Sequence, residues 1–280
     1  MDDQPTVLAE GLTFPEAPRW RMGRLWFSDM LAGRVMNVDL EGRTEIVLET
    51  PGWTSGLGWL PDGRLLVVSM QDRRLLRLDR DGLVVAANLE TTTSFVCNDM
   101  VVDEYGRAYV GEVGFDIHGG APFKPAALVL VQPDGEAQVC DADLACPNGA
   151  VITPDGRTLI VAESLADRLT AFDIRANGTL SRKRVWAAVD GLGPDGICLD
   201  AEGAIWVASP MKNALVRVAE GGRVTHRLAL EPPMPIAVML GDHDRRTLFI
   251  CRAPHPSVAT KSRQGRIDTL RVGVPGAGRP

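Results

Sequence analysis

Five oxygen-bearing side chains stand at equivalent points of a pattern that recurs along the chain. They are Glu16, Ser55, Asn98, Asn148 and Asp195. Oxygen atoms of Asp, Glu and Asn are the ligands that Ca²⁺, Mg²⁺ and Mn²⁺ prefer in proteins. If the fold brings these residues together, the two carboxylates repel one another and need a shared proton, a basic residue or a cation. No Lys or Arg occupies an equivalent position of the pattern, so a divalent cation is the favoured answer.

The same residues also have an ordinary structural meaning. Asn-Gly and Asp-Gly are common turn sequences, so Asn148-Gly149 and Asp195-Gly196, each taken alone, predict turns. The metal hypothesis depends instead on the place that the five residues share in the repeat. From the residues alone, both interpretations stay open.

The repeating unit is a polar start, an apolar run, a turn with Gly and further apolar runs. Its starts are separated by roughly 40–50 residues, which is the length of a propeller blade of four short strands. Asp62-Gly63 and Asp155-Gly156 mark hairpin turns in two of the repeats. Later runs such as 34–39 and 75–79 alternate in period two, as strands do, and no segment keeps a helical period over about twelve residues.

The sequence therefore predicts an all-β fold, a single six-bladed β-propeller domain spanning residues 1–280 with four-stranded antiparallel blades. Six blades of this size account for the 280 residues. The run 6–10 precedes the first repeat and is expected to form the outer strand of the last blade, which closes the ring. The segment 119–125 is expected to be a loop over one face, and the Gly/Pro-rich segment 273–280 a flexible tail.

Composition narrows the classes of partner. A net charge of -6 and a pI near 5.3 argue against nucleic acid, whose phosphates attract a basic face. No run of about eighteen apolar residues predicts a membrane span, and the acidic start lacks the apolar segment of a secretory signal. The five cysteines have no CxxC spacing and the four histidines have no metal-ligand spacing. These features indicate a reducing, cytoplasmic setting and weaken the case for zinc.

Longer motifs resemble the senescence marker protein, regucalcin and gluconolactonase family of six-bladed propellers. The resemblance extends from Gly11 to about Ile250 and is carried by the stretches 10–20 and 25–29 and by three short motifs. These motifs are Cys97-Asn98-Asp99, Pro147-Asn148-Gly149 and Pro194-Asp195-Gly196. The resemblance implies a metal-dependent lactonase, a carboxylic ester hydrolase that acts on a small-molecule lactone. It implies one divalent ion, Ca²⁺ in the first place, with Zn²⁺, Mn²⁺ or Mg²⁺ as alternatives.

The family pattern assigns roles to residues of this chain. By resemblance, Glu16, Asn148 and Asp195 coordinate the ion, and Asn98 is a fourth ligand or holds substrate beside the metal. Asp195 inherits the role of the base that activates water, with activation at the ion itself as the alternative. The oligomeric state is not indicated by the sequence.

One departure from the family pattern bears on the substrate. Members that act on sugar lactones usually carry an Arg two residues before the Asn of the Cys-Asn-Asp motif, and this chain has Val96 there. A lactone less polar than a sugar lactone is therefore expected, with Ser55, Val96, Asn98, Glu112 and Phe115 as substrate-binding candidates. Two alternatives stay open: a metal-dependent hydrolase of another ester or a phosphotriester, and a non-catalytic calcium-binding propeller.

Overall fold

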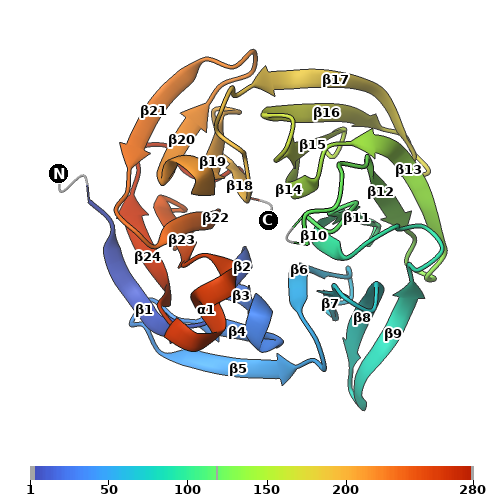
Figure 1. Cartoon of the computed structure of the whole chain (residues 1–280), viewed down its shortest axis with the longest axis horizontal. Helices are drawn as coiled ribbons and strands as arrows, with labels where there is room; N and C mark the ends of the chain where they lie inside the picture. The colour runs from blue at the N-terminus through green and yellow to red at the C-terminus, as the bar shows by residue number, and fades with distance from the viewer. Residues whose placement is uncertain (1–3, 118, 279–280) are drawn as a thin grey trace.

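The computed structural model describes residues 4–117 and 119–278. Its strands form six separate four-stranded antiparallel sheets, which stand around a central axis like blades (Figure 1). The predicted six-bladed β-propeller is confirmed.

Each blade runs from an innermost strand at the axis to an outermost strand at the rim. Blades 1 to 3 consist of β2 (Pro15–Arg21), β3 (Arg24–Asp29), β4 (Arg34–Val38) and β5 (Thr44–Glu49); β6 (Thr54–Trp59), β7 (Leu65–Ser69), β8 (Arg74–Asp79) and β9 (Gly82–Asn88); and β10 (Cys97–Val102), β11 (Ala108–Glu112), β12 (Ala126–Val131) and β13 (Ala137–Leu144). Blades 4 to 6 consist of β14 (Pro147–Ile152), β15 (Thr158–Glu163), β16 (Arg168–Ile174) and β17 (Leu180–Ala188); β18 (Ile197–Leu199), β19 (Ile205–Ser209), β20 (Ala214–Val218) and β21 (Val224–Ala229); and β22 (Met234–Gly241), β23 (Thr247–Ala253), β24 (Gly265–Arg271) and β1 (Thr6–Leu12).

The last blade joins the two ends of the chain. β1 pairs antiparallel with β24, so that Thr6 lies opposite Thr269 and Leu12 lies opposite Gly265. The N-terminal strand therefore closes the ring, as predicted from its position before the first repeat. Closure of this kind leaves no open gap between the first and last blades.

Apolar side chains fill the spaces between neighbouring blades. Between blades 4 and 5, for example, Val151 and Ile160 share a buried cluster with Ile205 and Val207. Burial of such surface contributes roughly 25 cal/mol per Å². The middle strands are buried on both faces, whereas the outermost strands expose residues such as Val224. The blades thus pack as wedges that hold the innermost strands in place.

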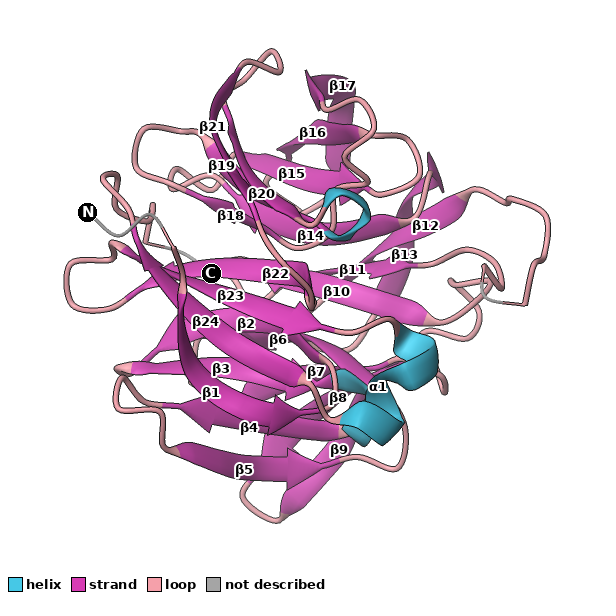
Figure 2. Ribbon diagram, turned by 60° about the vertical axis from the view of Figure 1, so that its left-hand side comes forward, coloured by secondary structure: helices cyan, strands magenta, loops and turns pink. Residues whose placement is uncertain are grey.

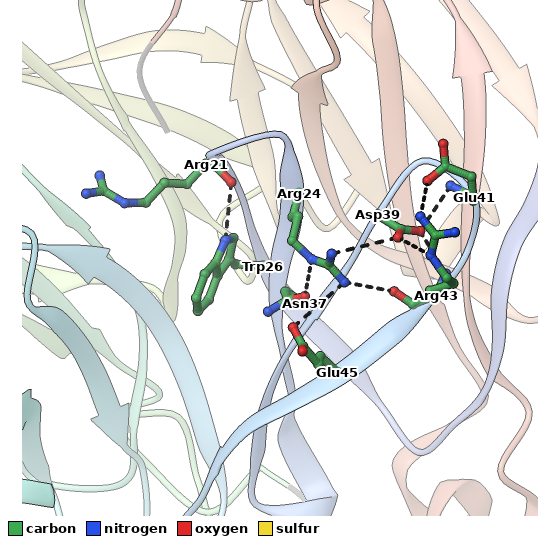
Figure 3. Close-up of polar contacts among 8 residues, drawn as sticks. All are labelled: Arg21, Arg24, Trp26, Asn37, Asp39, Glu41, Arg43 and Glu45. Carbon is green, nitrogen blue, oxygen red and sulfur yellow. Dashed lines mark hydrogen bonds and ion pairs between the residues drawn. The ribbon is translucent and has the colours of Figure 1, made fainter.

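Hairpin and turn residues behave as their sequence predicts. Gly63 and Gly156 adopt φ values of 88° and 71°, which favour glycine. In the turn between β4 and β5, the Asp39 carboxylate accepts hydrogen bonds from the backbone N–H groups of Glu41 and Arg43 and pairs with the Arg43 guanidinium (Figure 3). The contacts that stabilise these turns lie within each hairpin, so the turns do not depend on the residues at the centre of the ring.

A short helix, α1 (Pro256–Ser262), connects β23 to β24 and lies at one face of the ring (Figure 2). The His255 side chain accepts a hydrogen bond from the Ser257 N–H at its start. Seven residues are too few for the periodicity that a sequence pattern can detect. Among the residues that the structure describes, no helix is long and apolar enough to cross a membrane.

The segment that precedes the C-terminus contacts blade 5. The Ala277 N–H donates to the Leu199 carbonyl, and Gly276 forms a β-bridge with Asp200. Residues 276 and 277 of the expected tail are thus held by backbone hydrogen bonds. Residues 279 and 280 lie outside the described part of the chain.

Candidate metal centre

The predicted residues occupy the same structural position in successive blades. The second residues of β2, β6, β10 and β14 are, in order, Glu16, Ser55, Asn98 and Asn148. At each of these points the pairing register with the second strand of the blade shifts. Such β-bulges redirect side chains and often lie next to active sites. In blade 5, Asp195 stands two residues before β18, and its N–H donates to a carbonyl of β19.

Two glycines bring the innermost strands of blades 4, 5 and 6 close together. A Cβ atom on Gly149 would lie 2.6 Å from the Ile197 nitrogen and 2.8 Å from the Asp195 carbonyl oxygen. A Cβ atom on Gly196 would collide with Ala237 of the next blade. Neither glycine has a positive φ, and Gly149 lies inside β14. The Asn-Gly and Asp-Gly pairs therefore serve close approach between blades, and the turn interpretation is not supported.

Both asparagines use their amide nitrogens inside the protein. The Asn98 Nδ2 donates to the Pro147 carbonyl at 3.3 Å. The Asn148 Nδ2 donates to Ser164 Oγ at 3.3 Å, and that hydroxyl donates to the Pro194 carbonyl at 2.7 Å. These bonds tie blades 3, 4 and 5 to one another. They also orient each carboxamide so that its oxygen remains as the acceptor.

Acceptor oxygens without a donor gather at these positions. Within the described residues, Glu16 Oε2, Ser55 Oγ and Asn148 Oδ1 are buried and have no hydrogen-bond partner. Leaving a buried polar group unsatisfied costs roughly 1–3 kcal/mol, and more for a charged group. A cation held by Glu16 and Asn148 would satisfy two of the three atoms.

Three carboxylates interact at the centre. Burial raises the pKa of Glu16 well above its usual value, and the negative charges of Asp195 and Asp99 raise it further. Burial and the charge of Asp99 raise the pKa of Asp195 to about 8, against a hydrogen bond from Asn148 that lowers it. Burial also raises the pKa of Asp99 itself. These shifts have the direction expected of anions that lack a sufficient counter-charge.

Arg19 and Asp99 were not predicted as part of the site. Arg19 Nη2 lies 2.9 Å from Asp99 Oδ1, and both side chains are buried. Arg19 follows Glu16 by three residues, so it has no counterpart among the repeat starts. The sequence did contain a signal, because an Arg in the middle of an innermost strand is removed from water and needs a partner inside the protein.

Glu112, predicted to bind substrate, has both carboxylate oxygens engaged with the protein. Its Oε2 accepts from the backbone N–H groups of Ser94 at 2.7 Å and Phe95 at 2.8 Å, and its Oε1 accepts from β12. Glu163 holds the same place at the end of β15 and accepts from the Ala145 N–H in the same way. The recurrence indicates that Glu112 positions the segment leading into β10.

Val96 and Phe115 lie on the two segments that meet beside Asn98. The Val113 N–H donates to the Val96 carbonyl at 2.9 Å. The ring of Phe115 is buried and meets the 56% exposed ring of Phe123 edge-on, with 5.6 Å between centroids. Both aromatic residues belong to the loop between β11 and β12, of which residue 118 lies outside the described structure. Contact of these residues, or of the buried Ser55, with a substrate remains a prediction.

Cysteine chemistry does not fit this centre. Burial raises the pKa of the Cys146 and Cys97 thiols to about 12, so both are protonated at neutral pH. Across the described ranges, no three or more His, Cys, Asp or Glu side chains are placed to hold a metal ion. A metal site here must therefore draw on amide oxygens as well as on Glu16 and Asp195.

Comparison with known proteins agrees with the fold and the motifs. A pentonolactonase of Haloferax volcanii is 26% identical over 244 residues, covering 85% of this chain and 81% of its own. The diisopropyl-fluorophosphatase of Loligo vulgaris is 27% identical over 200 residues, covering 64% and 63%. The crystal structure of a calcium-binding protein, regucalcin, from Agrobacterium tumefaciens superposes with a TM-score of 0.82 at 22% identity, over 99% of this chain and 96% of that one.

The family model of the SMP-30/gluconolactonase/LRE-like region matches residues 14–253, which include blades 1 to 5, the two inner strands of blade 6 and each of the bulged positions described above. This chain therefore belongs to the SMP-30/gluconolactonase/LRE-like family.

Proposed function

We propose that the chain is a divalent-metal-dependent hydrolase that opens the ring of a small lactone less polar than a sugar lactone. The observation that carries the proposal is the charge of the centre. Glu16, Asp99 and Asp195 carry three formal negative charges that act on one another, and Arg19, paired with Asp99, supplies one positive charge. The remaining charge of -2 matches one divalent cation.

The donor set fits a hard cation such as Ca²⁺. Glu16 and Asp195 would supply carboxylate oxygens, and Asn148 and Asn98 would supply amide oxygens. Glu16 Oε2 and Asn148 Oδ1 have no other partner among the described residues. The similar regucalcin structure is described as that of a calcium-binding protein, and the same ion is the one we expect here.

Asp195 is the residue best placed to move a proton. Its pKa of about 8 lies near neutral pH, where a general base is most effective. A bound divalent cation would polarise the lactone carbonyl and stabilise the negative charge that develops on its oxygen. The Asp195 carboxylate accepts a proton from the water that attacks the carbonyl carbon. When the bond from this carbon to the ring oxygen breaks, the same proton returns to the leaving oxygen and the product is a hydroxy acid.

The apolar surroundings support the substrate class. Val96 takes the place where an Arg would contact the hydroxyl groups of a sugar lactone. The Phe115 and Phe123 rings lie on the loop that follows β11, at the end of the blade where β10 begins. As residues that line the substrate site, they would favour alkyl or aromatic lactones, because hydroxyl groups buried against them would lose their hydrogen bonds.

The proposal is tested by pH-stat hydrolysis of a lactone panel running from sugar lactones to alkyl and aromatic ones. Chelated protein is compared with protein refilled with Ca²⁺, Mn²⁺, Mg²⁺ or Zn²⁺, with Asp195→Asn as the matched variant. We expect turnover that depends on the metal, favours apolar lactones and is lost in the variant. A preference for sugar lactones would contradict the substrate class but not the chemistry, whereas absence of lactone turnover with every ion would contradict the function.

A second candidate function is hydrolysis of a phosphotriester. Its support is the similarity to diisopropyl-fluorophosphatase over 200 residues. The same centre would suit it, since a divalent cation stabilises charge on a phosphoryl oxygen as well as on a carbonyl oxygen. Adding a fluorophosphate and an aryl phosphotriester to the panel separates the two. Binding of Ca²⁺ without turnover of any substrate would instead favour a non-catalytic calcium-binding propeller.

A further inference from the structure

Arg19 is the cation that the structure places at the centre of the ring. It projects from β2, and its guanidinium pairs with Asp99 of β10, two blades away. Their side chains are 6% and 4% exposed, respectively. An ion pair buried to this extent is less screened by water than an exposed pair, so its charges act more strongly on neighbouring groups.

The guanidinium is also fixed in position. Its Nε donates to the Leu57 carbonyl at 3.1 Å, its Nη1 to the Pro18 carbonyl at 2.8 Å, and its Nη2 to the Met100 carbonyl as well as to Asp99. These acceptors belong to blades 1, 2 and 3. Arg19 therefore cannot turn toward solvent, and its charge stays a constant part of the centre.

Glu16 and Asp195, the two carboxylates assigned to the metal, lie within electrostatic reach of this pair. Glu16 is repelled by Asp99 and attracted by Arg19, and Asp195 is repelled by Asp99. Asp99 is not free to serve as a ligand in the same way, because its Oδ1 accepts from Arg19 and from the Met100 N–H. The pair thus places one positive and one negative charge beside the centre, which cancel, without adding a ligand.

We propose that Arg19 and Asp99 act together as positioning residues that hold the formal charge of the metal centre at -2, and that this charge selects a divalent over a trivalent cation. The inference rests on the proposed function, because it needs a cation at Glu16, Asn148 and Asp195. It goes further by assigning ion selectivity to two residues that do not coordinate the ion.

The charge argument predicts weaker binding for a single change and recovered binding when both charges are removed. Asp99→Asn leaves Arg19 uncompensated and changes the centre from -2 to -1. Since Coulomb energy scales with the charge of the bound ion, Ca²⁺ should bind at least about tenfold more weakly and Tb³⁺ about thirtyfold more weakly. The preference for Tb³⁺ over Ca²⁺ should therefore fall about threefold.

The test is the affinity of chelated protein for Ca²⁺, by calorimetry, and for Tb³⁺, by its luminescence, at one pH. The decisive variant is Asp99→Asn combined with Arg19→Met, which removes both charges and returns the centre to -2. We expect its Ca²⁺ affinity to recover to within about threefold of the original protein. Asp99→Asn combined with Arg19→Lys keeps the positive charge, carries the same number of changes and should stay weak.

A matched control removes a buried carboxylate of the same blade at the opposite end of its strands. Asp103 pairs with Arg107 at 2.6 Å, and both are buried. Asp103→Asn should change the Ca²⁺ affinity by less than about twofold. Far-UV circular dichroism of each variant checks that the blades have formed.

The outcomes separate this inference from the proposed function. If the original protein binds neither Ca²⁺ nor Tb³⁺, the metal centre is refuted and this inference with it. If it binds Ca²⁺ but the Arg19→Met double variant is as weak as Asp99→Asn alone, or weaker, the pair is merely structural and only this inference is refuted. Should the double variant not fold, the single variant still decides, because an unchanged ratio of Tb³⁺ to Ca²⁺ affinity refutes the role of charge.

Discussion

Chelated protein should lose stability as the pH rises from about 4 to about 8, and Asp195 should account for a measurable part of this loss. Burial and the charge of Asp99 hold its pKa at about 8 in the folded chain, against an ordinary value of 3.8. A carboxyl group with a raised pKa binds more protons in the folded state than in the unfolded state. Stability is therefore complete below about pH 4 and falls as the pH rises through the folded-state pKa.

The magnitude follows from the two pKa values. A pKa that rises from 3.8 to about 8 corresponds to at most about 6 kcal/mol of unfolding free energy between low and high pH. We expect a smaller loss of about 2–3 kcal/mol, because relaxation of the site and entry of water reduce the cost of a buried charge. Glu16 acts in the same direction, because its pKa is also raised.

Urea unfolding of chelated protein at pH 5 and pH 8.5 measures this loss. Asp195→Asn should show a much smaller difference between the two pH values, and saturating Ca²⁺ should abolish the difference in the original protein. Asp244→Asn is the control, because Arg271 holds the pKa of that exposed carboxyl at about 2, well below the window. An equal pH dependence in Asp195→Asn and the original protein would refute the reasoning.

Three further predictions concern activity and packing. Asp195→Asn should lower kcat on the preferred lactone by about 10²–10⁴-fold, the usual contribution of a general base, with an unchanged circular dichroism spectrum; retained turnover would remove Asp195 as the base. Val96→Arg should raise kcat/KM for sugar lactones relative to alkyl lactones by about tenfold, the value of one added hydrogen bond, and no change would show that this position does not contact substrate. Gly149→Ala should cost about 1–3 kcal/mol in urea unfolding, because its Cβ would press on the Ile197 nitrogen at 2.6 Å; Gly273→Ala, which has no atom within 4 Å of its Cβ, is the control, and equal losses would contradict the close-approach argument.

The blade count and the closure by β1 were predictable because they depend on local patterns. Apolar runs, Asp-Gly turns and their spacing are visible within one repeat at a time. The equivalence of Glu16, Ser55, Asn98 and Asn148 was visible for the same reason, since a residue at a fixed place in a repeat takes a fixed place in the ring. The bulges at these positions were not visible, because a register shift is a property of two paired strands.

The ion pair of Arg19 and Asp99 could not be found from the repeat. The two residues are separated by 80 positions and come from different blades. Neither has a counterpart in the other repeats, so no pattern relates them. Glu112 shows a different limit of the sequence. A carboxylate at the end of a strand can face a substrate or accept hydrogen bonds from backbone N–H groups, and the sequence alone does not distinguish these roles.

At the bulged positions the backbone is similar from blade to blade, whereas the side chains differ. The bulge recurs in blade 6 as well, where the second residue of β22 is Pro235 and the register again shifts. Proline brings neither charge nor a side-chain ligand, and Ser55 brings only a hydroxyl. Among these bulged positions only Glu16 is anionic, and Asp99 and Asp195 stand beside them in blades 3 and 5. The backbone at these positions is set by strand pairing and by close approach at glycines. Neither of these depends on the type of side chain at the bulge. On our proposal, ion preference can therefore change through the side chains at the bulges, and through the balance of charge between Arg19 and Asp99, while the six blades stay as they are.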